Sequence, residues 1–358
     1  MCNYKEQIEA LLDSFIKNSE LNINKDIVIE GRVPTSVSSE FITNKEQGDW
    51  AENLVFQVIN SSNSNYIAVH YGKDDDISAG DPGFKEFYEK YQDELNTIGK
   101  RPDILIFKRQ DIQKNDVITE EQVSKAVGAL EVRSSSFLLK KYDNFMLDRT
   151  NKSLNIIKDE ILKIKSNSQL DELLRNKDKV IYDFIHNATI ENIESLSFRQ
   201  RSWSSTPALR ELTEHLKIIK ENIKIVQKRD YLSITPKLED IALVNRWIQK
   251  YNVPHFYLQV FFDCAYIISF ADILKIASDP NKEGHEFTIE KDIKNQGKTT
   301  IKINIRYTDL IIDQIKMPNH YSAMKELDRG RLLFFVKFKG GEGCLELDAF
   351  NKILGLNK

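Results

Sequence analysis

The sequence contains few cysteines and no long apolar run. Its 358 residues include only three cysteines, Cys2, Cys264 and Cys344, which lie far apart and form no Cys-x-x-Cys pair. An odd and scattered set of cysteines excludes a disulfide-stabilised scaffold and does not predict a zinc site. The richest apolar stretch, residues 256–270, is interrupted by polar side chains, and a membrane span needs roughly 18–20 apolar residues. The N-terminal segment is amphipathic and charged, unlike a signal peptide, so we expect a soluble, cytoplasmic protein with no membrane partner.

A strong net charge is also missing. The 51 Lys and Arg residues nearly balance the 54 Asp and Glu residues, which gives a formal charge of −3. No global basic field therefore predicts a nucleic-acid partner, although a local basic cleft is compatible with an acidic protein. The acidic run Asp74–Asp76 lacks the alternating spacing of a calcium-binding EF-hand loop, and we interpret it as a solvated loop.

Two short apolar runs, each with a carboxylate at its edge, organise the rest of the chain. Residues 104–107 and 126–130 are of strand type; Asp103 precedes the first run and Glu131 follows the second. Because side chains alternate along a strand, Arg133 returns to the face of Glu131. If the two strands pair, two acids and one cation meet at one end of a sheet.

Two carboxylates and a cation in this arrangement suit a divalent metal. Mg²⁺ prefers oxygen ligands and retains several waters, so one or two carboxylates and a substrate phosphate complete its coordination shell. Arg133 can orient a water or stabilise the charge that develops on a phosphate. The pattern therefore favours metal-assisted hydrolysis of a phosphodiester. The alternative is that Asp103 and Glu131 are simply exposed acids at two strand ends.

The segments Pro102-Asp103 and Glu131-Val132-Arg133 resemble the PD-(D/E)XK motif of type II restriction endonucleases. The resemblance implies that Asp103 and Glu131 bind Mg²⁺, with the carbonyl oxygen of Val132 as a further ligand. It also implies that an activated water cleaves double-stranded DNA at a specific sequence and leaves a 5′-phosphate.

Arg133 departs from this family, which most often has lysine at that position. Arginine stays charged and does not readily act as a base, so Lys140 or Lys141 is an alternative for that role. The same departure favours a second function, a non-catalytic nucleic-acid-binding protein that retains a decayed nuclease core. A third alternative is a helical interaction protein whose acids all lie on its surface.

A second resemblance lies in the helix predicted over residues 39–60. Asn44 fits an N-cap, because Gln47 follows three residues later as in a capping box. Residues 44–52 are similar to the first core helix of many restriction endonucleases, which implies that Glu52 reaches the metal cluster. The alternative is that Glu52 is an ordinary solvated acid.

The order of the predicted elements matches the αβββαβ core of these enzymes. A helix is followed by a strand at 65–70, the two motif strands, a helix at 241–248 and a strand at 255–262. We therefore predict a mixed α/β fold with α+β character. It has three parts: a discontinuous nuclease core (1–140 and 230–275), a large helical insertion (141–229) and a β-rich C-terminal extension (276–358).

Two segments are candidates for DNA contact. Ser134 and Ser135 directly follow the motif, where hydroxyl groups either hold phosphate oxygens or end the strand. The segment 198–206 gathers cations, hydroxyls and a tryptophan without an acid, and such side chains bind bases and phosphates. Its candidate residues are Arg199, Arg201, Trp203, Ser204 and Ser205. The alternative is an ordinary loop around a buried tryptophan. We expect a homodimer if the DNA target is palindromic.

Overall fold

The computed structural model describes most of the chain and divides it into two compact units. The described residues are 3–19, 21, 23–31, 33–34, 37–62, 64–72, 77–112, 118–189, 192–193, 197–292, 298–327 and 330–355. The first unit comprises Met1–Leu139 and Leu232–Lys358, and the second comprises Lys140–Tyr231. The acidic run Asp74–Asp76 lies outside the described residues.

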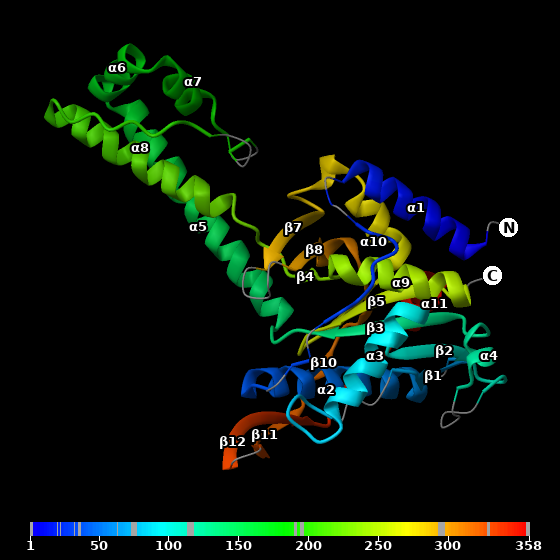
Figure 1. Cartoon of the computed structure of the whole chain (residues 1–358). Helices are drawn as coiled ribbons and strands as arrows, with labels where there is room; N and C mark the ends of the chain where they lie inside the picture. Colours follow the sequence, from blue (N-terminus) through cyan, green and yellow to red (C-terminus); the bar gives the residue numbers. More distant parts are fainter. Residues whose placement is uncertain are drawn as a thin grey trace. The chain divides into compact units, whose positions relative to one another are not determined.

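A six-stranded mixed sheet forms the centre of the first unit (Figure 1). In spatial order its strands are β1 (Tyr66–His70), β2 (Ile104–Lys108), β3 (Gly128–Ser134), β5 (His255–Val260), β6 (Ala265–Ser269) and β9 (Asp309–Ile312). Strands β3 and β5 are parallel, and every other neighbouring pair is antiparallel. The mixed α/β architecture predicted from the sequence is confirmed, and β6 and β9 extend the sheet beyond the four strands expected.

Helices cover both faces of this sheet because its strands are apolar on both sides. In β2, Leu105 and Phe107 belong to the core of one face, whereas Ile104 and Ile106 belong to the core of the other. The first face packs against α1 (Tyr4–Asn18), α9 (Leu238–Tyr251) and α10 (Phe270–Ala277). The second face packs against α2 (Ser39–Ser61) and α11 (Leu347–Ile353). In chain order, α2 precedes β1, β2 and β3, and α9 precedes β5, with α3 (Phe84–Ile98) and α4 (Glu120–Val123) among the connections.

Helix α2 begins earlier than its predicted cap. The side chain of Ser38 accepts a hydrogen bond from the backbone N–H of Phe41 at 3.1 Å, so Ser38 is the N-cap. The expectation that Asn44 caps the helix was wrong, because Asn44 lies inside it. The earlier start has a packing cause: Ile42 is buried in a small apolar cluster with residues of a C-terminal hairpin.

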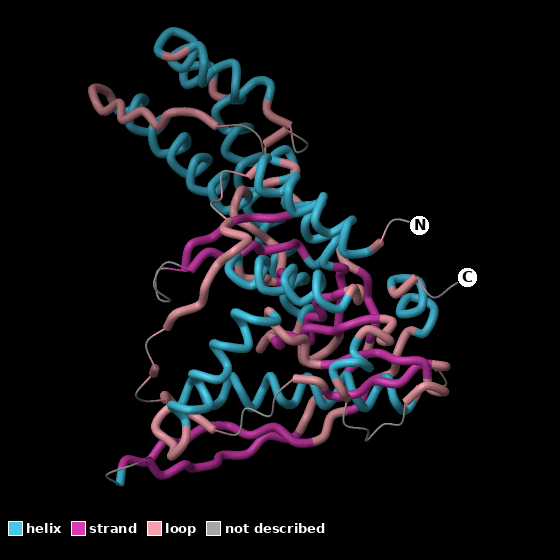
Figure 2. Tube along the Cα trace, turned by 45° about the vertical axis from the view of Figure 1, so that its right-hand side comes forward, coloured by secondary structure: helices cyan, strands magenta, loops and turns pink. Residues whose placement is uncertain are grey.

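The C-terminal residues are rich in strands, several of which support α2. Strands β11 (Asn319–Leu327) and β12 (Arg331–Lys339) form a hairpin that runs beside α2 (Figure 2). The N–H of Val336 donates to Oγ1 of Thr43 at 3.2 Å, and Nε1 of Trp50 donates to the carbonyl of Gly340 at 2.8 Å.

Two further small sheets involve C-terminal strands. Strands β10 (Ile315–Lys316) and β13 (Glu342–Gly343) pair with each other. Strands β7 (Phe287–Asp292) and β8 (Lys298–Asn304) form a separate sheet with β4 (Ser233–Ile234).

The second unit is helical and has its own apolar core. Its helices are α5 (Leu139–Ser166), α6 (Ser168–Lys177), α7 (Lys179–Asn187) and α8 (Pro207–Val226). Apolar residues at helical spacing, such as Ile161, Leu174 and Leu216, share this core. Oγ1 of Thr206 accepts from the N–H of Leu209, and Pro207 occupies the first position of α8, as expected for a helix start. No helix among the described residues has both the length and the apolarity required to span a membrane.

Candidate active site

Asp103 and Glu131 stand opposite each other where β2 and β3 pair. Ile104 pairs with Leu130, which places the preceding Asp103 beside Glu131 in the antiparallel register. The N–H of Asp103 donates to the carbonyl of Leu130 at 3.0 Å. The N–H of Val132 donates to Oδ2 of Asp103 at 2.6 Å. The expected pairing of the two motif strands is therefore observed, and it brings both acids to the same end of the sheet.

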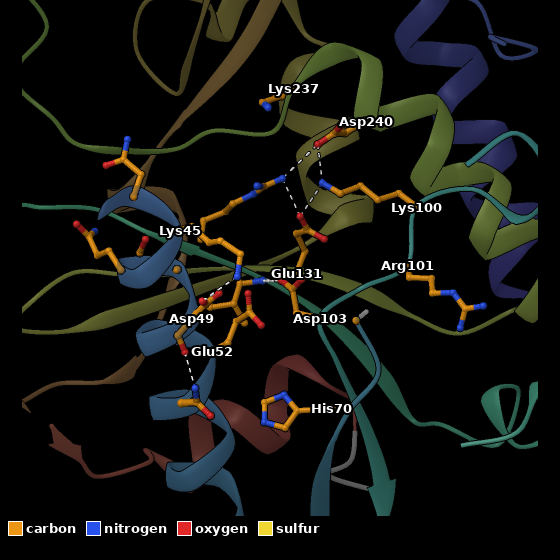
Figure 3. Close-up of a pocket in the computed structure, with 18 of the residues that line it drawn as sticks. Lys45, Asp49, Glu52, His70, Lys100, Arg101, Asp103, Glu131, Lys237 and Asp240 are labelled. Carbon is orange, nitrogen blue, oxygen red and sulfur yellow. Dashed lines mark hydrogen bonds and ion pairs between the residues drawn. The ribbon is translucent and has the colours of Figure 1, made fainter. Parts of the chain in front are cut away.

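Glu131 is buried and ion-paired, with only 2% of its surface exposed. Its Oε1 lies 2.7 Å from Nζ of Lys100 and 2.7 Å from Nη2 of Arg133. The same two cations contact Oδ2 of Asp240, at 2.7 Å for Lys100 and 3.2 Å for Arg133. Figure 3 shows Lys100 and Asp240 directed toward the carboxylate of Glu131. Two cations thus lie between two carboxylates.

The loop between α3 and β2 positions Lys100 against helix α9. The N–H of Lys100 donates to the carbonyl of Leu243 at 3.1 Å. The preceding Gly99 has a φ of 86°, and a Cβ at this residue would lie 2.2 Å from the carbonyl oxygen of Leu243. Glycine is therefore required for this close approach. Asp240 lies in the first turn of the same helix, where the helix dipole favours a negative charge.

These residues line a cleft with a volume of about 1050 Å³. Glu52 reaches the cleft from α2, and Asp103 and Glu131 reach it from the sheet. Figure 3 shows Glu52 beside Asp103. The structure therefore brings the predicted acid of the first core helix to the two motif acids.

The acids of the cleft differ in how readily they ionise. Burial and the negative charges of Glu131 and Glu52 raise the pKa of Asp103 well above its usual value. Burial alone would also raise the pKa of Glu131, but the two neighbouring cations hold it below its usual range. The same cations lower the pKa of Asp240 against the effect of burial. A cation bound beside Asp103 would offset the repulsion that Asp103 experiences from Glu131 and Glu52.

A protein-family model described as AccI restriction endonuclease matches residues 3–358. The chain belongs to the AccI restriction endonuclease family. It is therefore a type II restriction endonuclease, a hydrolase that binds DNA and cleaves it at specific sequences. The match includes both structural units, so the family extends well beyond the two motif strands. No curated protein and no solved structure matches the chain.

Restriction endonucleases generally use a divalent metal, and the donor atoms of this AccI-family cleft fit one. Oε2 of Glu131 is buried and has no hydrogen-bond partner among the described residues. A buried carboxylate oxygen needs a partner, and hard cations take oxygen ligands of this kind. Within the described ranges, however, no three acid, His or Cys side chains are already gathered around one point. The other oxygen of Glu131 faces Lys100 and Arg133 instead.

Lys100 and Asp240 were not among the predicted site residues. Lys100 directly precedes Arg101-Pro102-Asp103, whereas the predicted alternatives for the motif lysine follow the Glu131 motif. These alternatives, Lys140 and Lys141, belong to the second unit. Asp240 carries no sequence signal beyond being an acid in the first turn of a predicted helix.

The predicted serines next to the motif have different environments. Ser134 lines the cleft. The N–H of Ser135 donates to the carbonyl of Val260 at 2.9 Å, which continues the pairing of β3 with β5. Ser136, which was not singled out, also lines the cleft and donates from Oγ to Oε1 of the buried Gln47 at 2.7 Å. This bond connects the end of β3 to α2.

The candidate residues of segment 198–206 lie in the second unit, whereas the cleft lies in the first. Nε of Arg201 donates to Oδ2 of Asp178 at 2.8 Å. Trp203 is half-buried against the apolar core of this unit, and its backbone N–H donates to Oγ1 of Thr213 at 3.0 Å. The other three candidates, Arg199, Ser204 and Ser205, are exposed.

Proposed function

We propose that the cleft around Asp103 and Glu131 is the catalytic centre of this restriction endonuclease and that it uses Mg²⁺. The observation that carries the proposal is the environment of Glu131. This buried carboxylate has one oxygen without a described partner, stands beside Asp103 and has two cations next to it. Oxygen donors suit Mg²⁺, and adjacent cations suit a phosphate whose negative charge grows during the reaction.

The carboxylates of Asp103 and Glu131, together with the carbonyl oxygen of Val132, would hold the ion. Glu52 would support these ligands or hold a second ion. Bound Mg²⁺ would supply a water of lowered pKa and neutralise charge on the scissile phosphate. Arg133 stabilises the negative charge on that phosphate, and Lys100 adds a second positive charge on the same side of Glu131.

We assign the PD-(D/E)XK core to α2, β1, β2, β3, α9 and β5. Their order along the chain and the position of Glu52 on α2 support this assignment. The helical residues 140–231 are then an insertion between β3 and α9. The alternative of a decayed core rested on the missing motif lysine, and Lys100, at 2.7 Å from Glu131, weakens it.

We infer that DNA is contacted by Ser134 and Ser135 beside the cleft and by segment 198–206 of the helical insertion. The exposed Arg199 and the hydroxyls of Ser204 and Ser205 in that segment are suited to phosphate contacts. A homodimer would match the two-fold symmetry of a palindromic target. Sedimentation velocity with and without DNA tests the dimer, and a monomer under both conditions would rule it out.

Cleavage of plasmid DNA tests the catalytic assignment. Asp103→Asn and Glu131→Gln remove one charge each with little change in shape, and we expect each to slow Mg²⁺-dependent cleavage by at least about 10²–10³-fold. Glu121→Gln, at an exposed acid of α4, serves as the matched control and should cut like the wild type. The assignment fails if Asp103→Asn cuts at the wild-type rate, or if the wild type cuts equally well in EDTA.

A further inference from the structure

The cluster at Glu131 contains one carboxylate that the proposed metal site does not use. Asp240 belongs to α9, and the side chain of this acid is only 14% exposed. It contacts the same two cations as Glu131, so Lys100 and Arg133 each have two anionic partners. In this arrangement Glu131 and Asp240 compete for the same positive charges.

Binding of a divalent cation at Glu131 would change this balance. The two added positive charges would repel Lys100 and Arg133 and draw Glu131 toward the metal. Both cations are largely enclosed, with side-chain exposures of 16% and 29%, so without a second anion the loss of Glu131 as a partner would leave them buried and unpaired. Such a state is strongly unfavourable. Asp240 is the partner that remains.

We propose that Asp240 is a positioning residue that keeps Lys100 and Arg133 beside the scissile phosphate while Glu131 binds the metal. This inference rests on the proposed function of the Asp103–Glu131 cleft. The backbone N–H of Lys100 donates a hydrogen bond to Leu243 of α9, the helix that also carries Asp240. Helix α9 therefore positions both Lys100 and the acid that orients it. The cations can therefore change partners without a movement of the chain.

Substitutions on the anionic and the cationic side of the cluster should have opposite effects on the affinity for the metal. Asp240→Asn leaves both cations to Glu131 alone, which strengthens their competition with the metal and should weaken metal binding about tenfold. Lys100→Met removes one competitor and should strengthen metal binding about threefold. Both variants should cut DNA more slowly, because each disturbs the positive charge beside the phosphate.

Calorimetric titration of the full chain with Mn²⁺, without DNA, measures these effects. In the Lys100→Met background, Asp240→Asn should weaken binding by only about threefold, because one of the two cations it releases is gone. Asp240→Glu retains the charge and should stay within about threefold of the wild type. Glu239→Gln, in the same helical turn, is the matched control and should bind Mn²⁺ like the wild type.

Each outcome decides between the inference and the proposed site. If Asp103→Asn binds Mn²⁺ as tightly as the wild type, the metal site itself is misplaced. If Asp103→Asn loses binding but Asp240→Asn does not weaken it, only the role of Asp240 is wrong. If Asp240→Asn does not fold, as judged by circular dichroism, Lys100→Met decides: weaker Mn²⁺ binding in that variant overturns the inference, and tighter binding supports it.

Discussion

Replacing a residue of the proposed metal site should make the metal-free protein more stable. Asp103 lies beside Glu131 and Glu52, and burial together with the negative charges of these two acids raises its pKa. Asp103→Asn removes this repulsion, and the amide oxygen of the new side chain can still accept the hydrogen bond from the N–H of Val132. We therefore expect a gain in the free energy of unfolding at neutral pH in EDTA.

The size of this gain follows from opposing contributions. Two like charges several ångströms apart repel by about 2–3 kcal/mol at an effective dielectric constant of about 20. The attraction of Lys100 and the bond from Val132 both favour the ionised Asp103 and offset part of this repulsion. A net gain of about 1–2 kcal/mol remains, which corresponds to a rise in Tm of about 2–4 °C.

The stability gained by Asp103→Asn should decrease as the pH falls. Because the pKa of Asp103 is raised in the folded state, wild-type stability falls as the pH rises through that pKa. The advantage of Asp103→Asn is therefore present at pH 7. This advantage disappears toward about pH 4, near the pKa of an aspartate in the unfolded state. At that pH, Asp103 of the wild type is already protonated in the folded state and becomes protonated in the unfolded state as well.

Guanidinium unfolding in EDTA at pH 7 and pH 4.5 measures both effects. Asp81→Asn is the matched control. Asp81 accepts a hydrogen bond from Nζ of Lys325 at 2.7 Å. Burial acts to raise the pKa of Asp81, but the hydrogen bonds that it accepts, chiefly the one from Lys325, outweigh burial and lower the pKa. Its neutralisation should reduce stability by about 0.5–1 kcal/mol. If Asp103→Asn also reduces stability at pH 7, repulsion from Glu131 and Glu52 does not destabilise the ionised Asp103. Excess Mg²⁺ should stabilise the wild type but not Asp103→Asn.

Single contacts elsewhere in the structure can each be tested by one substitution. Gly99→Ala would place a Cβ 2.2 Å from the carbonyl oxygen of Leu243. It should lower the free energy of unfolding by about 2–3 kcal/mol and slow DNA cleavage. Gly284→Ala is the control: Gly284 has a φ of 89° but open space around it, so the loss should be only about 1 kcal/mol. Ser136→Ala removes the bond to the buried Gln47 and should lower the free energy of unfolding by about 1–2 kcal/mol; an unchanged value would contradict that bond. Arg199→Ala should weaken DNA binding in Ca²⁺ and reduce the slope of log K against log salt by about 1, and an unchanged slope would exclude a phosphate contact by Arg199.

The pairing of the two motif strands was accessible from the sequence because local patterns specify it. Each apolar run has an acid at one edge, and the alternation of side chains along β3 places Glu131 and Arg133 on one face. The contacts of Lys100 were not accessible in this way. Asp240 lies 140 residues further along the chain, and the loop that carries Lys100 reaches α9 only because Gly99 permits the approach. No hydrophobic periodicity in the sequence indicates a contact between residues so far apart.

The start of α2 illustrates the same limit on a smaller scale. Asn44 and Gln47 have the spacing of a capping box, but tertiary packing of Ile42 extends the helix past them to Ser38. Gln47 then binds Ser136 rather than the backbone of a cap. Local propensity is a weak guide where a distant hairpin covers the helix.

Anomalous scattering from Mn²⁺ in a crystal of the protein shows directly whether Asp103 and Glu131 bind one metal ion between them. We expect one strong peak in contact with carboxylate oxygens of both Asp103 and Glu131, at about 2.0–2.2 Å, with Lys100 and Arg133 paired to Asp240. An active enzyme whose Mn²⁺ binds elsewhere, with Glu131 still paired to both cations, would contradict it.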